Sequence, residues 1–224
     1  YLRTVGTAVI VNVAGEDEDQ FVRLVEMVNN EPGLAAVELN LSCPNVSHGL
    51  DLGIDPRAVE RVVRRSRAAG PLPVIAKLTP NVTDIVAIAR AAAEGGADAV
   101  SLVNTFRGMA IDWRRRRPIL ANDVGGLSGP AIKPLALRCV WDIARALPEL
   151  PILGIGGIQD ADDALEFLVA GASAIQVGTA TFADPTAAEA VLDGLIERFD
   201  GAGIESVRSL IGSLRSNAES RRVH

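Results

Sequence analysis

Six short apolar runs recur along the chain, and their length and spacing predict buried parallel strands. The runs are Ala8–Val13, Ala36–Leu41, Val74–Leu78, Ala99–Val103, Ile152–Ile155 and Ala174–Val177. They begin about 33 residues apart on average, which is the length of one strand–helix unit. The pattern therefore indicates a repeated strand–helix architecture.

Helical patterns fill the intervals between these runs. Several begin at an aspartate that can cap a helix, followed by a proline that suits the first turn, such as Asp55-Pro56 and Asp184-Pro185, and two end at glycine. The expected helices are Phe21–Asn30, Arg57–Ala69, Asp84–Glu94, Leu135–Leu147, Ala161–Ala170 and Thr186–Phe199. Strands that alternate with helices predict a parallel α/β fold, and no linker divides the chain into domains.

One interval breaks the alternation. Residues Asn104–Pro134 have no helical period and contain the basic run Arg114–Arg117 and several glycines. A loop of this length inside a compact domain is usually functional or disordered. We expect the arginine run to be a solvated face of the loop, with contact to a partner or an acidic substrate as the alternative.

Polar residues and glycines gather directly after the predicted strands. They are Asn40, Ser42, Lys77, Asn104, Gly156-Gly157 and Gly178-Thr179. Functional groups after many strands, rather than at one crevice, indicate a (β/α)8 TIM barrel. Such a barrel needs eight strands, and the chain shows six. We therefore expect residues 1–224 to form one barrel domain that is incomplete at its N-terminus, with two strand–helix units preceding Tyr1.

Composition excludes several classes of protein. The 28 acidic and 22 basic residues give a net charge of −6, which argues against general binding to nucleic acid. No apolar run reaches the roughly 18 residues that a membrane helix needs, so no membrane partner is expected. The two cysteines, Cys43 and Cys139, are too few for a disulfide framework and favour a reducing, cytoplasmic compartment.

The glycine turns after the last two strands predict a phosphate site. Gly156-Gly157 and Gly178-Thr179 occupy the position where the loops of a barrel commonly bind phosphate through backbone N–H groups. Glycine lets the backbone approach the anion closely. Two ordinary tight turns are the alternative interpretation.

Lys77 and Cys43 are the candidate reactive side chains. Lys77, one of only two lysines, would point into the barrel mouth, where a cation stabilises negative charge. A lysine that reaches to the surface is the alternative. Cys43 directly follows a strand and has polar neighbours, so it could be a nucleophile or a general base. Cys139 is expected to be a packing residue. No cluster of residues has metal-ligand spacing.

Taken together, these motifs resemble one family. The segments are Asn40–Asn45 (NLSCPN), Val74–Asn81 (VIAKLTPN), Leu102–Asp112 (LVNTFRGMAID), Gly125–Pro134 (GGLSGPAIKP), Gly154–Ile158 (GIGGI) and Gln176–Ala180 (QVGTA). They resemble the dihydroorotate dehydrogenases, in order along the chain. The resemblance implies a barrel that holds FMN at its mouth and oxidises dihydroorotate to orotate in pyrimidine synthesis. A base removes the C5 proton, and the C6 hydride passes to the flavin.

The resemblance also implies residue roles. Cys43 would be the catalytic base, as in the class 1 enzymes. Asn40, Asn45, Asn104 and Thr105 would bind the substrate, and Asn12, Asn40, Lys77, Val103, Gly129, Gly156, Gly157, Gly178 and Thr179 would bind FMN. The GMAID and GGLSGPAIKP segments look most like the NAD-linked subtype. That subtype implies a homodimer and an electron-transfer subunit that carries FAD and an iron–sulfur cluster.

Other functions remain open on the sequence. Within the interpretation as a flavin oxidoreductase, the related fumarate-linked subtype and the dihydropyrimidine-type flavin reductases are alternatives. A flavin-free lyase or isomerase could use the same glycine turns to bind a sugar phosphate. An inactive fragment could retain the motifs without assembling the site.

Overall fold

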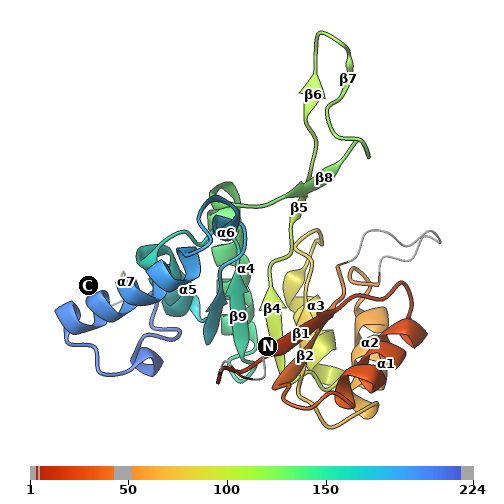
Figure 1. Cartoon of the computed structure of the whole chain (residues 1–224), viewed down its shortest axis with the longest axis horizontal. Helices are drawn as coiled ribbons and strands as arrows, with labels where there is room; N and C mark the ends of the chain where they lie inside the picture. The colour runs from red at the N-terminus through yellow and green to blue at the C-terminus, as the bar shows by residue number, and fades with distance from the viewer. Residues whose placement is uncertain (1–3, 5, 43–51, 218–224) are drawn as a thin grey trace.

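A six-stranded parallel sheet forms the centre of the computed structural model, which describes residues 4, 6–42 and 52–217 (Figure 1). The strands are β1 (Ile10–Val13), β2 (Ala36–Asn40), β3 (Val74–Lys77), β4 (Ala99–Leu102), β9 (Ile152–Ile155) and β10 (Ala174–Gln176), paired in that order. All six strands expected from the sequence are confirmed, each with bounds within two residues. Strands β1 and β10 are the two edges of the sheet.

Six longer helices follow these strands and confirm the predicted alternation. They are α1 (Glu18–Asn29), α2 (Pro56–Ala68), α3 (Ile85–Glu94), α4 (Lys133–Ala146), α5 (Ala161–Ala170) and α7 (Ala187–Ala202). Aspartate side chains cap four of them by accepting backbone N–H groups of the first turn: Asp17, Asp55, Asp84 and Asp160. The pattern did not predict the short helix α6 (Ala180–Ala183) or the 3₁₀ turns η2 (Pro130–Ile132) and η3 (Val207–Ser209).

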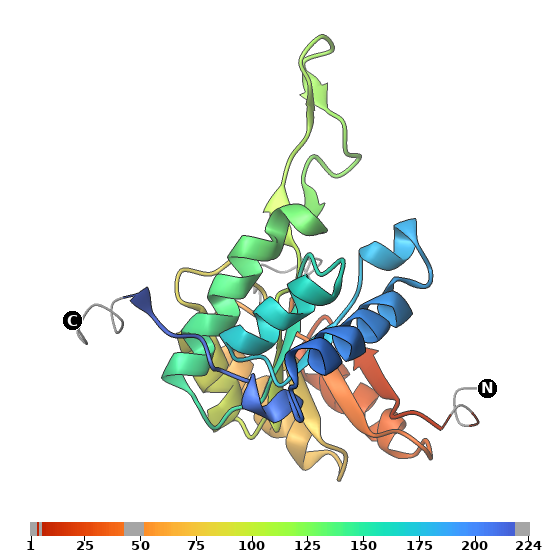
Figure 2. The ribbon, with the colours of Figure 1, turned by 90° about the vertical axis from the view of Figure 1, so that its left-hand side faces the viewer.

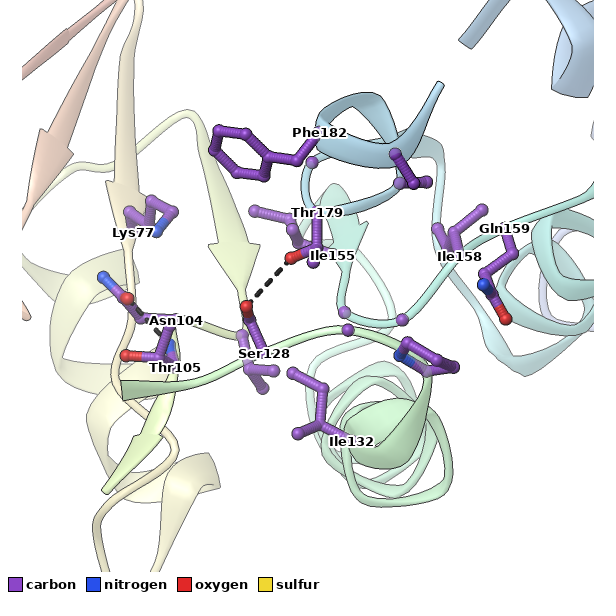
Figure 3. A pocket seen from close by; sticks show the side chains of 18 residues that line it. Lys77, Asn104, Thr105, Ser128, Ile132, Ile155, Ile158, Gln159, Thr179 and Phe182 are labelled. Carbon is purple, nitrogen blue, oxygen red and sulfur yellow. Dashed lines mark hydrogen bonds between the residues drawn. The ribbon is translucent and has the colours of Figure 1, made fainter. Parts of the chain in front are cut away.

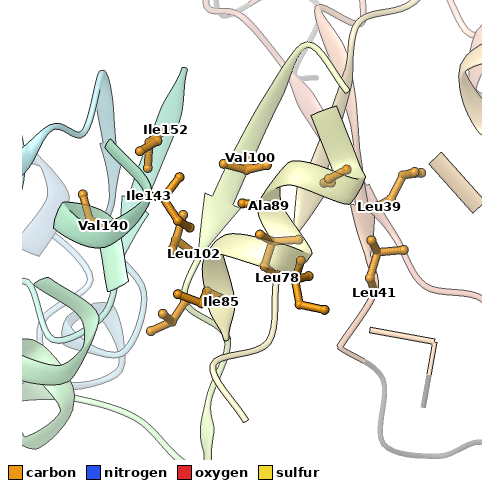
Figure 4. Close-up of a cluster of buried hydrophobic side chains, with 14 of the residues drawn as sticks. Leu39, Leu41, Leu78, Ile85, Ala89, Val100, Leu102, Val140, Ile143 and Ile152 are labelled. Carbon is orange, nitrogen blue, oxygen red and sulfur yellow. The ribbon is translucent and has the colours of Figure 1, made fainter. Parts of the chain in front are cut away.

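The hydrophobic core lies between one face of the sheet and the helices (Figure 4). Alternate strand residues point to this face: Val100 and Leu102 lie toward Ile143 of α4, and Leu39 lies further along the sheet (Figure 4). All four are fully buried. Cys139 packs against the same core, as expected, and burial raises the pKa of its thiol.

The opposite face is the inside of a curled sheet. At one level it holds a small apolar cluster of Ala36, Ile75 and Ala99. Gln176 of β10 reaches across this face to donate a hydrogen bond to Glu38 of β2, although three strands separate β2 from β10 in the sheet. A flat sheet could not bring these two side chains together, so the six strands curve like part of a barrel wall.

The interval from Asn104 to Pro134 is not the irregular loop that the sequence suggested. It contains β5 (Phe106–Gly108) paired with β8 (Gly125–Leu127), and β6 (Ile111–Asp112) paired with β7 (Arg117–Pro118), both antiparallel. Strands of two or three residues are too short to show a periodic pattern, which explains the error. We call residues 106–127 the arm. It projects from the body in both views (Figures 1 and 2).

The arm carries exposed apolar side chains. Met109, Ile111, Trp113 and Ile119 are all more than half exposed. The guanidinium of Arg114 lies over the Trp113 ring at 4.7 Å from its centroid. The arginine run is exposed, as predicted.

Candidate functional site

Two cavities open at the carboxyl ends of the strands. The first, of about 430 Å³, is shown in Figure 3. Its lining includes seven of the residues predicted to bind a cofactor, together with Asn104 and Thr105: Lys77, Val103, Gly129, Gly156, Gly157, Gly178 and Thr179. The second, of about 860 Å³, is lined by Asn40, Ser42, Asn81 and parts of the arm. Asn104 and Thr105 line both cavities, so the two spaces adjoin.

The turn after β9 can be built only from glycine. Gly156 and Gly157 have φ angles of 135° and 79°, a region that other residues rarely adopt. A Cβ on Gly157 would lie 2.9 Å from the carbonyl oxygen of Gly129. The backbone of this turn therefore packs directly against the segment that opens α4.

The turn after β10 faces open space. A Cβ on Gly178 would meet no atom within 4 Å, so this backbone is accessible from the cavity. The Thr179 hydroxyl donates to the Ser128 hydroxyl at 2.9 Å, which joins this turn to the residue that follows the arm (Figure 3). Together the two turns border one side of the first cavity, where the sequence predicted a phosphate site.

A chain of hydrogen bonds through asparagine side chains lies at the boundary between the two cavities. The Asn104 amide nitrogen donates to the Asn40 side-chain oxygen at 3.1 Å, and the Thr105 backbone N–H donates to the Asn104 side-chain oxygen at 2.7 Å. Asn81 donates to the Thr105 carbonyl oxygen at 3.0 Å and accepts from the Arg107 N–H at 2.9 Å. Strands β2 and β4 and the base of the arm are thus held together by polar groups that border the cavities.

Lys77 ends β3 and lines the first cavity, as the sequence predicted (Figure 3). Burial lowers the pKa of its ammonium, because leaving water disfavours the charged form. The nearby carboxylate of Glu38 acts in the opposite direction and favours the ammonium. The side chain therefore offers a partly desolvated cation to an anionic or electron-rich ligand.

Asn12 lies elsewhere than the other predicted cofactor residues. It lines neither cavity, and its amide donates to the Glu38 carboxylate at 2.5 Å. Asn12 pairs with Glu38 in the register of the sheet, and Asn40, two residues further along β2, pairs with Lys77. Asn12 thus belongs to a polar layer next to the one that carries Asn40 and Lys77.

Some site residues lie outside the described part of the chain, and others were not predicted. Cys43 and Asn45 are outside the described residues. Among residues that the sequence reasoning missed, Ser128, Ile132 and Phe182 line the first cavity. Ser128 stands within the GGLSGPAIKP segment and could have been identified there. Nothing in the sequence pattern identifies Phe182 as a site residue. In the structure it is 91% exposed.

Lys133 has a structural role in this region. Its ammonium lies 2.5 Å from a carboxylate oxygen of Asp163 and 2.9 Å from one of Glu166, so it ties α4 to α5. Asp163 also accepts the Gln159 backbone N–H at 2.8 Å, just after the glycine turn. These contacts stabilise the segment that follows the turn at Gly156-Gly157.

Two other kinds of feature are absent from the described ranges. No group of three or more His, Cys, Asp or Glu side chains there could hold a metal ion. None of the helices described there is long and apolar enough to cross a membrane.

Comparison of the chain with known proteins gives one family. The sequence profile of dihydroorotate dehydrogenase matches residues 3–199. A protein of Geobacter sulfurreducens named dihydroorotate dehydrogenase B (NAD(+)), catalytic subunit, is 54% identical over 215 residues, and its namesake in Geotalea uraniireducens is 52% identical. Each match covers 96% of this chain and 70% of the relative.

Solved structures agree. The crystal structure of DHODH from Eimeria tenella in complex with ferulenol superposes with a TM-score of 0.74 at 25% identity. The match covers 88% of this chain and 57% of that one. The strand order, the curl of the sheet and the position of the cavities fit a partial TIM barrel, as predicted from the sequence. With the profile match over most of its length and relatives above 50% identity, the chain belongs to the dihydroorotate dehydrogenase family.

Proposed function

We infer that this chain is the FMN-binding part of an NAD-linked dihydroorotate dehydrogenase, which oxidises dihydroorotate to orotate in pyrimidine biosynthesis. One observation carries the proposal: the two adjoining cavities share Asn104 and Thr105 at the carboxyl edge of the sheet. Redox chemistry between a cofactor and a substrate needs two binding spaces in contact. In this proposal residues 1–224 act as a single FMN-binding domain.

The first cavity fits FMN by the chemistry of its lining. The glycine turns at Gly156-Gly157 and Gly178-Thr179 offer close backbone approach for a phosphate, and Gly129 borders the same space. Lys77 offers a cation, and Val103, which is 3% exposed, offers an apolar wall. A ring system with a phosphate at one end matches this distribution. Asn12 would support the flavin from the adjacent polar layer.

The second cavity fits the pyrimidine. Asn40, Asn104 and Thr105 supply donors and acceptors for the ring amides of dihydroorotate. Asn45 and the catalytic base Cys43 belong to the segment that follows β2, and their roles come from the family motif. In the reaction Cys43 takes the C5 proton of the substrate. When bound, FMN supplies the acceptor for the hydride that leaves C6. The Lys77 ammonium in the first cavity favours negative charge on the cofactor.

The proposal includes partner chains. The relatives above are named as catalytic subunits, which implies a second kind of subunit. We propose an electron-transfer subunit with FAD and an iron–sulfur cluster that passes electrons to NAD, and a homodimer of the catalytic chain, in the cytoplasm. The exposed apolar side chains of the arm, with Trp113 at 72% exposure, are a surface that a protein partner would cover.

Anaerobic flavin reduction tests the function. The natural protein should be yellow, should release FMN on denaturation, and should bleach near 450 nm when dihydroorotate is added. Bleaching by dihydrouracil but not by dihydroorotate would favour a dihydropyrimidine-type reductase instead. A colourless protein that binds no FMN would favour a flavin-free lyase or isomerase. Transfer of electrons to fumarate but not to NAD by the complete complex would point to the other subtype.

A further inference from the structure

The inside of the curled sheet holds one buried carboxylate that the proposed reaction does not use. Glu38, in the middle of β2, is 5% exposed. It accepts hydrogen bonds from Asn12 of β1 at 2.5 Å, from the Ser101 hydroxyl of β4 at 2.6 Å and from the Gln176 amide of β10 at 3.2 Å. A buried charge is tolerated only when it is well hydrogen-bonded, and these three donors meet that need.

The three donors come from strands that do not pair with one another. In the sheet, β1 lies on one side of β2, β4 lies two places away on the other side, and β10 is the far edge. Backbone pairing fixes the distance between neighbouring strands but leaves the curl between distant strands free to vary. The Glu38 carboxylate joins β1, β2, β4 and β10 across the inside of the sheet and so restricts that curl.

The joined strands lead to opposite ends of the proposed flavin site. Gln176 is two residues before Gly178, where the proposed phosphate turn begins. Lys77 of β3 lines the other end and interacts electrostatically with Glu38, and Asn40 of β2, which pairs with Lys77, borders the adjoining second cavity. The distance between the phosphate end and the ring end of the site therefore depends on the bonds that Glu38 accepts.

We propose that Glu38 is a positioning residue whose carboxylate, through Gln176, holds the phosphate-binding turn of β10 at a fixed distance from Asn40 of β2 and Lys77 of β3. This inference rests on the proposed FMN site. It assigns to Glu38 no contact with the flavin or with the substrate.

A ligand that occupies both ends of the site reports on their spacing. FMN consists of riboflavin joined to a phosphate, and the affinity gained from that phosphate depends on how well the two ends are preorganised. If the bridge is lost, riboflavin should bind nearly as before, whereas the advantage of FMN over riboflavin should shrink. Simple loss of fold stability would not change that ratio selectively.

The experiment compares FMN and riboflavin binding to the natural holoenzyme, stripped of flavin, by quenching of flavin fluorescence. Gln176→Met removes one donor at nearly constant shape and leaves Asn12 and Ser101 on the carboxylate. We expect the ratio of FMN to riboflavin affinity to fall about tenfold or more, within the range that linkage of two sites provides. Glu38→Gln should lower the ratio as well and also weaken riboflavin, because Asn12 loses its charged acceptor.

Two control variants separate positioning from stability. Gln20→Met makes the same chemical change in α1, away from the site. Val62→Ala removes methyl groups from the fully buried side of α2 and lowers the thermal midpoint. Both should keep the wild-type affinity ratio. If Glu38→Gln fails to fold, Gln176→Met alone still decides.

The outcomes are distinct. A wild-type protein that binds FMN, with an unchanged ratio in Gln176→Met, overturns the role of Glu38 and leaves the proposed function intact. An equal fall of the ratio in Val62→Ala would also overturn it, because the ratio would then follow stability. A wild-type protein that binds neither flavin overturns the proposed function, and this inference with it.

Discussion

Gly157→Ala should destabilise the fold and impair the flavin site together. With φ at 79°, the position costs a non-glycine residue about 1–2 kcal/mol. The new Cβ would also lie 2.9 Å from the backbone oxygen of Gly129, and 3.0 Å from both the backbone nitrogen and the Cβ of Lys133. Such overpacking against backbone costs roughly 1–3 kcal/mol. The sum is roughly 2–5 kcal/mol, which lowers the thermal midpoint by several degrees or more.

Two matched glycine variants show whether the geometry is the cause. Gly178→Ala meets no atom within 4 Å, so its free energy of unfolding should stay within about 0.5 kcal/mol of wild type while its methyl group narrows the cavity and weakens FMN. Gly201→Ala lies in helix α7 with open space around it and should be neutral or slightly stabilising. Urea unfolding of the flavin-free protein measures all three. An unchanged midpoint for Gly157→Ala would refute the argument from φ and close contact.

Three other changes test separate parts of the site. Cys43→Ala should slow flavin reduction by dihydroorotate about 100-fold or more in stopped-flow experiments, with FMN retained; Cys139→Ala is the control, and equal rates would remove Cys43 from the mechanism. Lys77→Met should lower the flavin midpoint potential, since reduced flavin is anionic, and an unchanged potential at full occupancy would make Lys77 a passive surface residue. Lys133→Met should cost about 1–2 kcal/mol of unfolding free energy. Asp163 and Glu166 raise the pKa of Lys133 above its ordinary 10.5 by hydrogen bonding. The stabilisation that the Lys133 ammonium gives to the folded state is therefore complete below pH 10.5. It is lost only as the pH rises through the higher pKa that Lys133 has in the folded protein. Urea midpoints at pH 7 and pH 10 should show the same difference from wild type, and a difference already lost at pH 10 would contradict this.

The main strands and helices were predictable because each leaves a signal of sufficient length. Runs of four to six apolar residues identified the strands, and the capping aspartate Asp55 identified the start of a helix. The arm was not predictable on the same basis. Strands β6 and β7 have two residues each, which is too short for an alternating pattern to appear, although their partners lie close together in the sequence.

The site was predictable as far as it depends on position after a strand. Lys77, Asn104 and the glycine turns were identified because groups at the carboxyl ends of parallel strands meet at one edge of the sheet. Phe182 gave no such signal, since it stands on the short helix α6, which the pattern did not predict. Its place on the first cavity follows from the backbone after β10 and not from its own residue type.

The polar layer inside the sheet was missed for a different reason. Asn12, Glu38, Ser101 and Gln176 each stand in a run that is mostly apolar, and the runs were interpreted as buried on both faces. The interruptions fall at positions that point to the inside of the curl, where the structure joins them through one carboxylate. A single polar residue in one strand carries little information. Four of them in strands that converge indicate a shared interior network.

The network is built around a charged side chain, and stability alone does not explain that choice. Replacing a buried charge and its partners with well-packed apolar groups is often neutral or even stabilising, so stability alone does not favour Glu38. The neighbouring interior cluster of Ala36, Ile75 and Ala99 shows that this sheet packs apolar side chains at an adjacent level. Apolar contacts are not directional, so strands joined only by apolar side chains can shift slightly relative to one another. Hydrogen bonds to a carboxylate are directional and oppose such shifts. A site whose two ends stand on strands β3 and β10, which do not pair with each other, depends on the distance between those strands. The directional network at Glu38 supplies a constraint on that distance that the apolar layer does not.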